Sequence, residues 1–159
     1  MRHAIRMMAL VLALGLSGPV VAGPFEDAFA AYGKGDYATA LRLWRPLADQ
    51  GDAYAQSNLG SMYRKGEGVP QDYVQAVKWY RKAAEQGHAA AQSNLGVMYG
   101  NGAGVPVNNV RAYMWWSLAK AQCDKGAAEH LDIVKKLMTP ADIAKAQALA
   151  TETWEKLSN

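Results

Sequence analysis

Few residues of this chain are of the types that carry chemistry. The 159 residues include three histidines, of which His88 and His130 lie well inside the sequence, and a single cysteine, Cys123. A metal site needs several such ligands close together, and the sequence has no His-Glu-x-x-His or Cys-x-x-Cys spacing. A nucleophilic cysteine needs a feature that lowers the pKa of its thiol, and Gln122 and Asp124 beside Cys123 supply none. We therefore expect no catalytic residue, no metal and no cofactor.

Other catalytic signatures are also missing. There is no Gly-x-Ser-x-Gly elbow, and Gly66-x-Gly68 lacks the preceding strand, the third glycine and the lysine of a phosphate-binding loop. We expect His88 and His130 to be surface residues at the starts of separate helices. Cys123 is expected to be an inert side chain at a helix end. A single cysteine excludes an internal disulfide but leaves an intermolecular one open.

The first 22 residues have the pattern of a secretory signal peptide. Arg2 and Arg6 give a positive start, an apolar run follows over residues 7–16, and small residues end at Ala22. We predict cleavage after Ala22 and a periplasmic or secreted mature domain of residues 23–159. The run is about half of the roughly 20 residues that a spanning helix needs, so we expect no stable membrane insertion after cleavage.

The charge balance argues against nucleic acid as a partner. The formal net charge is +3 at pH 7, and removal of Arg2 and Arg6 would bring it close to zero. Tight binding to a phosphate backbone requires an excess of lysine and arginine, so we expect no nucleic-acid binding. The remaining length suits one domain.

A repeat of about 36 residues organises that domain. Residues 51–86 align with residues 87–122 without a gap. The recurring segments are Ala55-Gln56-Ser57-Asn58-Leu59-Gly60 with Ala91-Gln92-Ser93-Asn94-Leu95-Gly96, and Gly66-x-Gly68-Val69-Pro70 with Gly102-x-Gly104-Val105-Pro106.

Each unit predicts two helices joined by a tight loop. In the first helix the apolar residues recur at helical spacing, from Ala55 through Leu59 to Tyr63. Gly66 ends this helix, and Asp72 starts the second as its N-cap, a role that Asn108 takes one repeat later. The residues expected on the buried stripe of the second helix are Tyr73, Ala76, Val77, Tyr80, Ala83 and Ala84.

Partial units flank the two complete ones. The full set is about 25–50, 51–86, 87–122 and 123–159. The first lacks the Gly-x-Gly-Val-Pro loop. The last contains a helix over 127–138 and a closing helix to about residue 157, with Ile143, Ala146, Ala150 and Trp154 facing inward. A solenoid needs such a cap because each unit buries its apolar face only against a neighbour.

The pattern Ala-x-x-x-Leu-Gly-x-x-Tyr-x-x-Gly-x-Gly-Val-x-x-Asp, followed by Ala-x-x-Trp-(Tyr or Trp)-x-x-Ala, resembles the Sel-one-like repeat (SLR) family, relatives of the tetratricopeptide solenoids. The resemblance implies an all-α fold, a right-handed α/α superhelical solenoid of antiparallel helix pairs with a C-terminal capping helix. It also implies that the concave face, lined by the first helices, binds partner proteins or peptides. The corresponding positions of this chain are Tyr54, Ser57, Ser61, Arg64, Ala90, Ser93 and Val97.

Two features have alternative interpretations. Asn58 and Asn94 either bond the backbone of a partner or, as we favour, loop carbonyls of a neighbouring helix. Trp115-Trp116 is either a platform for a ligand or, as we favour, part of the core.

The function expected from the resemblance is that of an exported protein-protein interaction module, an adaptor or regulator in the bacterial cell envelope. We expect a monomer whose protein or peptide partner is unknown, and no enzyme activity. The alternative is a cell-wall-related enzyme or binder of peptidoglycan or β-lactams, because a cysteine-rich branch of the family is linked to penicillin-like compounds. That branch carries a cysteine pair in each repeat, which this chain lacks.

Overall fold

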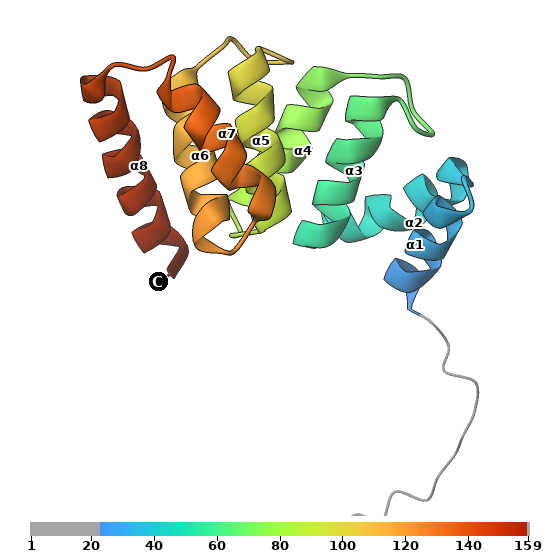
Figure 1. Cartoon of the computed structure of the whole chain (residues 1–159). Helices are drawn as coiled ribbons and strands as arrows, with labels where there is room; N and C mark the ends of the chain where they lie inside the picture. Colours follow the sequence, from blue (N-terminus) through green and yellow to red (C-terminus); the bar gives the residue numbers. More distant parts are fainter. Residues whose placement is uncertain (1–22, 159) are drawn as a thin grey trace, which may run out of the picture.

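The computed structural model describes residues 23–158, and in that range it contains eight helices and no strand. The helices are α1 (Pro24–Gly33), α2 (Tyr37–Asp49), α3 (Ala53–Lys65), α4 (Tyr73–Ala84), α5 (Ala89–Asn101), α6 (Asn109–Ala121), α7 (Lys125–Lys135) and α8 (Pro140–Ser158). Figure 1 shows them following one another from α1 and α2 at one end to α8 at the other. The fold is the predicted all-α, right-handed α/α solenoid. The predicted signal peptide, residues 1–22, lies outside the described residues.

The predicted start and stop signals act as expected. The side chains of Asp72 and Asn108 each accept a hydrogen bond from the backbone N–H three residues on, both at 2.9 Å. These bonds pair amides that the first turn of a helix leaves without a partner. Gly66 and Gly102 end α3 and α5 in the left-handed conformation, with φ of 74° and 68°.

Small residues in the first helices let the helices approach closely. Leu59 and Leu95 are fully buried, as the repeat predicted. Gly96 of α5 lies against the ring of Trp116, so close that an added Cβ would stand 2.6 Å from the ring nitrogen. Gly60 of α3 has the same relation to Tyr80. Glycine at this position therefore fixes the separation of the two helices within a unit.

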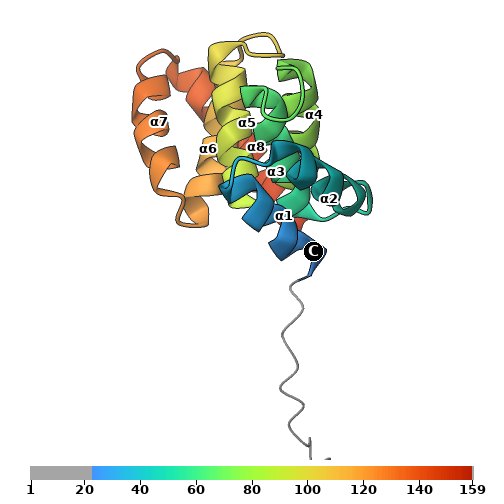
Figure 2. The same cartoon turned by 90° about the vertical axis from the view of Figure 1, so that its right-hand side faces the viewer.

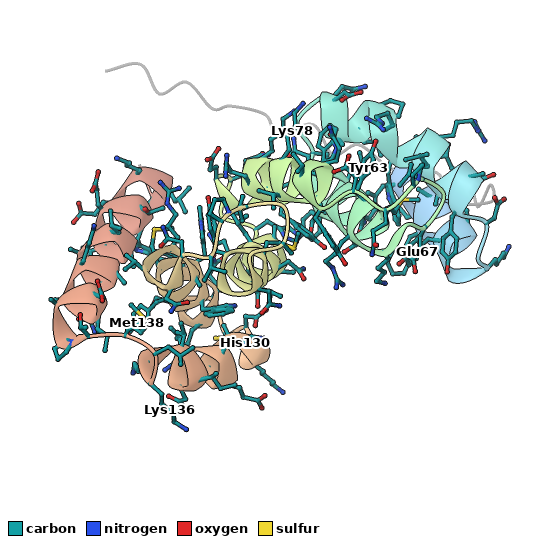
Figure 3. The ribbon with its side chains drawn as sticks, turned by 90° about the horizontal axis from the view of Figure 1, so that it is seen from above. Tyr63, Glu67, Lys78, His130, Lys136 and Met138 are labelled. Atoms are coloured by element: carbon teal, nitrogen blue, oxygen red, sulfur yellow. The ribbon has the colours of Figure 1, made fainter. Side chains whose placement is uncertain are left out.

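The C-terminal end of the stack departs from a plain helix pair. α7 packs on α6, and α8 also packs on α6, which it covers from another side. Figure 3 shows α7 and α8 on different sides of α6, joined by the segment that contains Met138. Leu131, Val134 and Ala146 are buried in this region. α8 thus closes the end of the core, as a capping helix must.

Two residues predicted to face inward are instead exposed, Tyr73 by 42% and Trp154 by 44%. Tyr73 is the first residue of α4, and helical side chains lean toward the N-terminus, so its ring extends past the end of the helix. On α8 the inward stripe passes through Thr153 and Leu157, which are partly buried. Trp154 lies at the edge of that stripe.

The histidine prediction is partly wrong. His88 is the N-cap of α5, at a helix start as expected, but it is only partly exposed. His130 lies in the middle of α7 and is also partly buried. Its ring stacks on Trp116 with ring centroids 4.8 Å apart, and Figure 3 shows it pointing from α7 toward the neighbouring helices. The stacking explains the burial, because an aromatic neighbour on α6 covers one face of the imidazole.

Candidate binding surface on the first helices

The seven predicted contact residues all lie on α3 and α5. On α3, Tyr54, Ser57, Ser61 and Arg64 stand three or four residues apart and so form one stripe along the helix. Ala90, Ser93 and Val97 occupy the equivalent stripe of α5. We call the surface formed by α1, α3, α5 and α7 the first-helix face.

A groove of about 620 Å³ opens in this face between α1, α3 and α5, which lie near one another in Figure 2. We call it the aromatic groove. Its lining residues are Phe25, Phe29, Tyr54, Ser57, Asn58, Ser61, Gly87, His88, Ala89, Ala90, Asn94 and Gln122. Four of the predicted contacts belong to it, and no lysine, arginine, aspartate or glutamate does.

Aromatic rings dominate one side of the groove. Phe29 is 62% exposed and Tyr54 is 64% exposed, although both are large apolar side chains. The rings of Phe25 and Tyr54 meet edge to face with centroids 6.2 Å apart, and the ring of His88 meets Tyr54 at 4.6 Å in the same manner. Such contacts hold the rings in place beside the opening.

His88 is kept neutral by its surroundings. Its Nδ1 atom accepts a hydrogen bond from the Ala91 N–H at 3.2 Å, which caps α5. Burial lowers the pKa of His88, and the nearby Asp52 carboxylate only partly opposes this effect. Because Nδ1 acts as the acceptor, the neutral ring carries its proton on Nε2. The groove wall is therefore uncharged at this point as well.

A second depression of about 500 Å³ lies at the other ends of α3 and α5. We call it the basic hollow. It is lined by Arg64, Lys65, Gln71, Tyr73, Val97, Met98, Asn101 and Ala103. Two further predicted contacts, Arg64 and Val97, belong to it.

The two cations of the basic hollow differ in their partners. Lys65 lies 3.7 Å from the Glu67 carboxylate and donates to the Tyr32 hydroxyl, a bond that raises the pKa of Lys65. Arg64 donates from Nε to the Tyr80 hydroxyl at 3.3 Å, a neutral group. Within residues 23–158, no carboxylate stands within ion-pair distance of Arg64. The charge of Arg64 thus has no ion-pair partner among these residues.

Two predicted contact residues offer less to a partner. Ser57 lines the groove but is only 7% exposed. Ser93 lies in neither depression. Its hydroxyl donates to the Asp124 carboxylate at 3.3 Å, and its carbonyl accepts from the indole N–H of Trp116 at 3.1 Å. Through these two bonds Ser93 links α5 to α6 and to the start of α7.

The interhelical bonds expected of the asparagines are made by glutamines instead. Asn94 donates to the Ala90 carbonyl of its own helix at 2.9 Å. Gln92 donates to the Ala84 carbonyl at 3.2 Å and accepts from Gln122 at 2.8 Å. Gln92 reaches the neighbouring helices because it points into the stack, whereas Asn94 lines the groove.

The same arrangement occurs one unit earlier. Gln56 donates to the Ala48 carbonyl at 3.0 Å and accepts from Gln86 at 2.8 Å. The signal was present in the sequence, since these glutamines recur in step with the repeat. Trp115 and Trp116 are buried, as the core interpretation predicted.

Two further properties of the described residues bear on this surface. The part of the chain that the structure describes contains no group of three or more His, Cys, Asp or Glu side chains arranged to hold a metal ion. Over the same residues, no helix combines the length and apolarity needed to cross a bilayer. The aromatic groove is lined mainly by rings, amides and hydroxyls, and the basic hollow adds the cations of Arg64 and Lys65.

Comparison with known proteins places the chain among helical repeat proteins. The family model described as Sel1 repeat matches residues 30–52, 53–88 and 89–122. The chain belongs to the Sel1 repeat family. Sel1 repeat proteins are protein-interaction modules, and their fold is typically a non-catalytic scaffold. A search of curated proteins gave no match.

Two solved structures show how far the likeness extends. One is c5321, a protective antigen of uropathogenic Escherichia coli strains with an SLR fold, at 32% identity and a TM-score of 0.81 over 84% of this chain. Another is a Sel1 repeat protein from Oxalobacter formigenes, at 29% identity and a TM-score of 0.68 over 81% of this chain. The chain spans 30% of the first structure and 55% of the second.

Proposed function

We propose that this protein is an exported adaptor or regulator of the bacterial cell envelope that binds a segment of a partner protein along a concave first-helix face. The observation that carries the proposal is the aromatic groove. It is open, it contains no formal charge, and two large apolar rings stand beside it with more than half of their surface exposed.

The groove has the groups that an extended segment needs. Phe29 and Tyr54 offer ring surface to an apolar side chain, and burying about 100 Å² of it would stabilise a complex by about 2.5 kcal/mol before the cost of ordering is subtracted. Asn58 and Asn94 line the same groove and carry amides that can bond the peptide groups of a partner.

Export is supported by residues 1–22, whose charge, apolar run and small residues follow the order of a signal peptide. N-terminal sequencing of the protein from a periplasmic fraction is expected to begin at Gly23. A chain that retains Met1 in that fraction, or that is found only in the cytoplasm, would remove the envelope from the proposal.

Cross-linking in the periplasm followed by mass spectrometry tests the binding face. We expect Phe29→Ser and Tyr54→Ser to lose partners that the unaltered protein cross-links. The matched control is Val74→Ser on α4, because Val74 has the same 62% exposure as Phe29 but lies on a second helix. Unchanged cross-links in the two groove variants, or equal losses in the control, would reject this face.

A further inference from the structure

We propose that the bound segment is an extended peptide with a bulky apolar side chain and, about four or five residues away, an acidic side chain. The apolar side chain binds in the aromatic groove and the acidic one binds Arg64. This inference rests on the proposed function, since it specifies the segment that the first-helix face accepts.

The aromatic groove selects the apolar end. Its twelve lining residues provide no charged side chain, so a charged group of the peptide would lose its hydration there without gaining a counterion. The exposed faces of Phe29 and Tyr54 gain most from a large apolar side chain, because the free energy of burial grows with apolar area.

Arg64 selects the acidic end. Arg64 is partly buried, and within residues 23–158 its guanidinium makes one hydrogen bond, from Nε to the Tyr80 hydroxyl. The two terminal nitrogens remain for a carboxylate, which a guanidinium holds with two parallel hydrogen bonds. The other cation of the basic hollow, Lys65, already has the Glu67 carboxylate at 3.7 Å. Arg64 therefore supplies the unbalanced positive charge.

The spacing follows from helix geometry. Tyr54 and Arg64 stand ten residues apart on α3, which is about 15 Å along a helix that rises 1.5 Å per residue. An extended chain covers this distance in about four or five residues at roughly 3.3 Å each. Between the two ends, Ser61 and the Asn58 amide lie on the same stripe and can bond the peptide backbone.

The acidic group is a side chain and not the C-terminal carboxylate of the peptide. Terminal carboxylates are held by clusters of backbone N–H groups. The basic hollow instead lies at the C-terminal ends of α3 and α5, where a helix presents carbonyl groups and not N–H groups. The carbonyls of Tyr63 and Arg64 already accept hydrogen bonds from Asp72 and Gln71. An internal aspartate or glutamate, whose backbone continues past Arg64, avoids placing a chain end against those carbonyls.

Selection from a phage-displayed library of random dodecapeptides, with the full chain as bait, tests the inference. We expect enriched sequences to share an aromatic or large aliphatic residue and an Asp or Glu four or five positions away. Synthetic copies of these peptides with blocked ends should bind Arg64→Gln about tenfold more weakly or worse, since charge-assisted hydrogen bonds are lost. Replacing Glu by Gln in the peptide should cost the unaltered protein as much and Arg64→Gln nothing further.

The control variant is Arg81→Gln, because Arg81 is also partly buried and donates to a tyrosine hydroxyl, that of Tyr99. It should bind the selected peptides as the unaltered protein does, and circular dichroism should show both variants folded. Peptides that bind in the groove, with affinity lost in Tyr54→Ser but equal in Arg64→Gln, would overturn the acidic requirement and leave the proposed function standing. Peptides indifferent to both Tyr54 and Arg64 would overturn the proposed function itself.

Discussion

Cys123 stands where the two preceding units have glycine. Gly51 and Gly87 occupy the equivalent positions after α2 and α4, with φ of 102° and 85°. Cys123 has φ of 66° and is the only non-glycine residue with positive φ among residues 23–158. An L-residue is disfavoured here because its Cβ crowds the following carbonyl oxygen. We predict that Cys123→Gly stabilises the protein.

The size of the gain follows from two opposing effects. The left-handed conformation costs an L-residue about 1–2 kcal/mol, and glycine loses about 0.5–1 kcal/mol more than other residues through backbone entropy on folding. The thiol is exposed, so its removal sacrifices little burial. The net expectation is a gain of about 0.5–1 kcal/mol, which raises the melting temperature by about 2–4 °C.

Urea denaturation followed by circular dichroism at 222 nm, under reducing conditions, measures the free energy of unfolding. Cys123→Ala is the control, since it removes the thiol but keeps the Cβ and should leave that free energy unchanged. The reverse substitution, Gly87→Ala, should destabilise by a similar amount, because an added Cβ meets nothing within 4 Å there and only the backbone conformation is affected. Equal gains for Cys123→Gly and Cys123→Ala would refute the backbone argument.

Three further predictions concern the core and the groove wall. Burial lowers the pKa of His88 below its ordinary value of 6.5, so the unfolded state binds the proton more tightly. The free energy of unfolding therefore falls as the pH drops from about 7 through 6.5 and toward the folded-state pKa. His88→Asn keeps a capping side chain, and it should flatten that part of a pH series of urea titrations. Gly96→Ala places a methyl group against Trp116 and should cost about 1–3 kcal/mol in the same titration. Gln92→Leu removes two hydrogen bonds, the one to the Ala84 carbonyl and the one from Gln122. It should also cost about 1–3 kcal/mol, at about 0.5–1.5 kcal/mol for each bond, measured as a lower melting temperature.

Each of these has a control or a contrary outcome. Gly33→Ala places a Cβ where no atom lies within 4 Å, so it should be neutral or slightly stabilising, because alanine favours a helix more than glycine does. An equal loss there would mean that the contact with Trp116 is not what makes Gly96→Ala costly. Parallel pH series for His88→Asn and the unaltered protein would contradict the neutral cap. A stable Gln92→Leu would mean that the Gly87 N–H, which donates to the Ala84 carbonyl at 3.0 Å, is sufficient for that carbonyl and that the bonds of Gln92 add nothing to stability.

The repeat, with its N-cap residues and helix-ending glycines, predicted most of the fold. Local chemistry decides where a helix begins or ends, because N-caps and left-handed glycines act within one turn of the chain. This applies to Asp72, Asn108 and Gly66. The burial of Leu59 and Leu95 followed from the 3.6-residue period in the same way. Such features depend on neighbours in sequence, so a sequence can predict them.

The wrong predictions concern side chains whose burial or bonding depends on residues that are close in space but distant in sequence. Periodicity assigns a face to a whole helix, but Tyr73 extends past the end of α4 and Trp154 lies at the edge of the stripe on α8. The choice between Asn94 and Gln92 as the interhelical bond donor depended on which side chain points into the stack. The aromatic groove also needed the structure, since Phe29 belongs to a helix outside the aligned units.

The difference between the two complete units explains why only the first of them has an arginine at this position of its first helix. Arg64 corresponds to Gly100 one unit later, and Tyr80 corresponds to Trp116. The smaller Tyr80 ring leaves room for Arg64 and bonds it through the hydroxyl. The larger Trp116 ring fills that space, so that a Cβ on Gly100 would stand 3.0 Å from it. One exchange in the core, tyrosine for tryptophan, thus decides whether the neighbouring surface position can carry a charge.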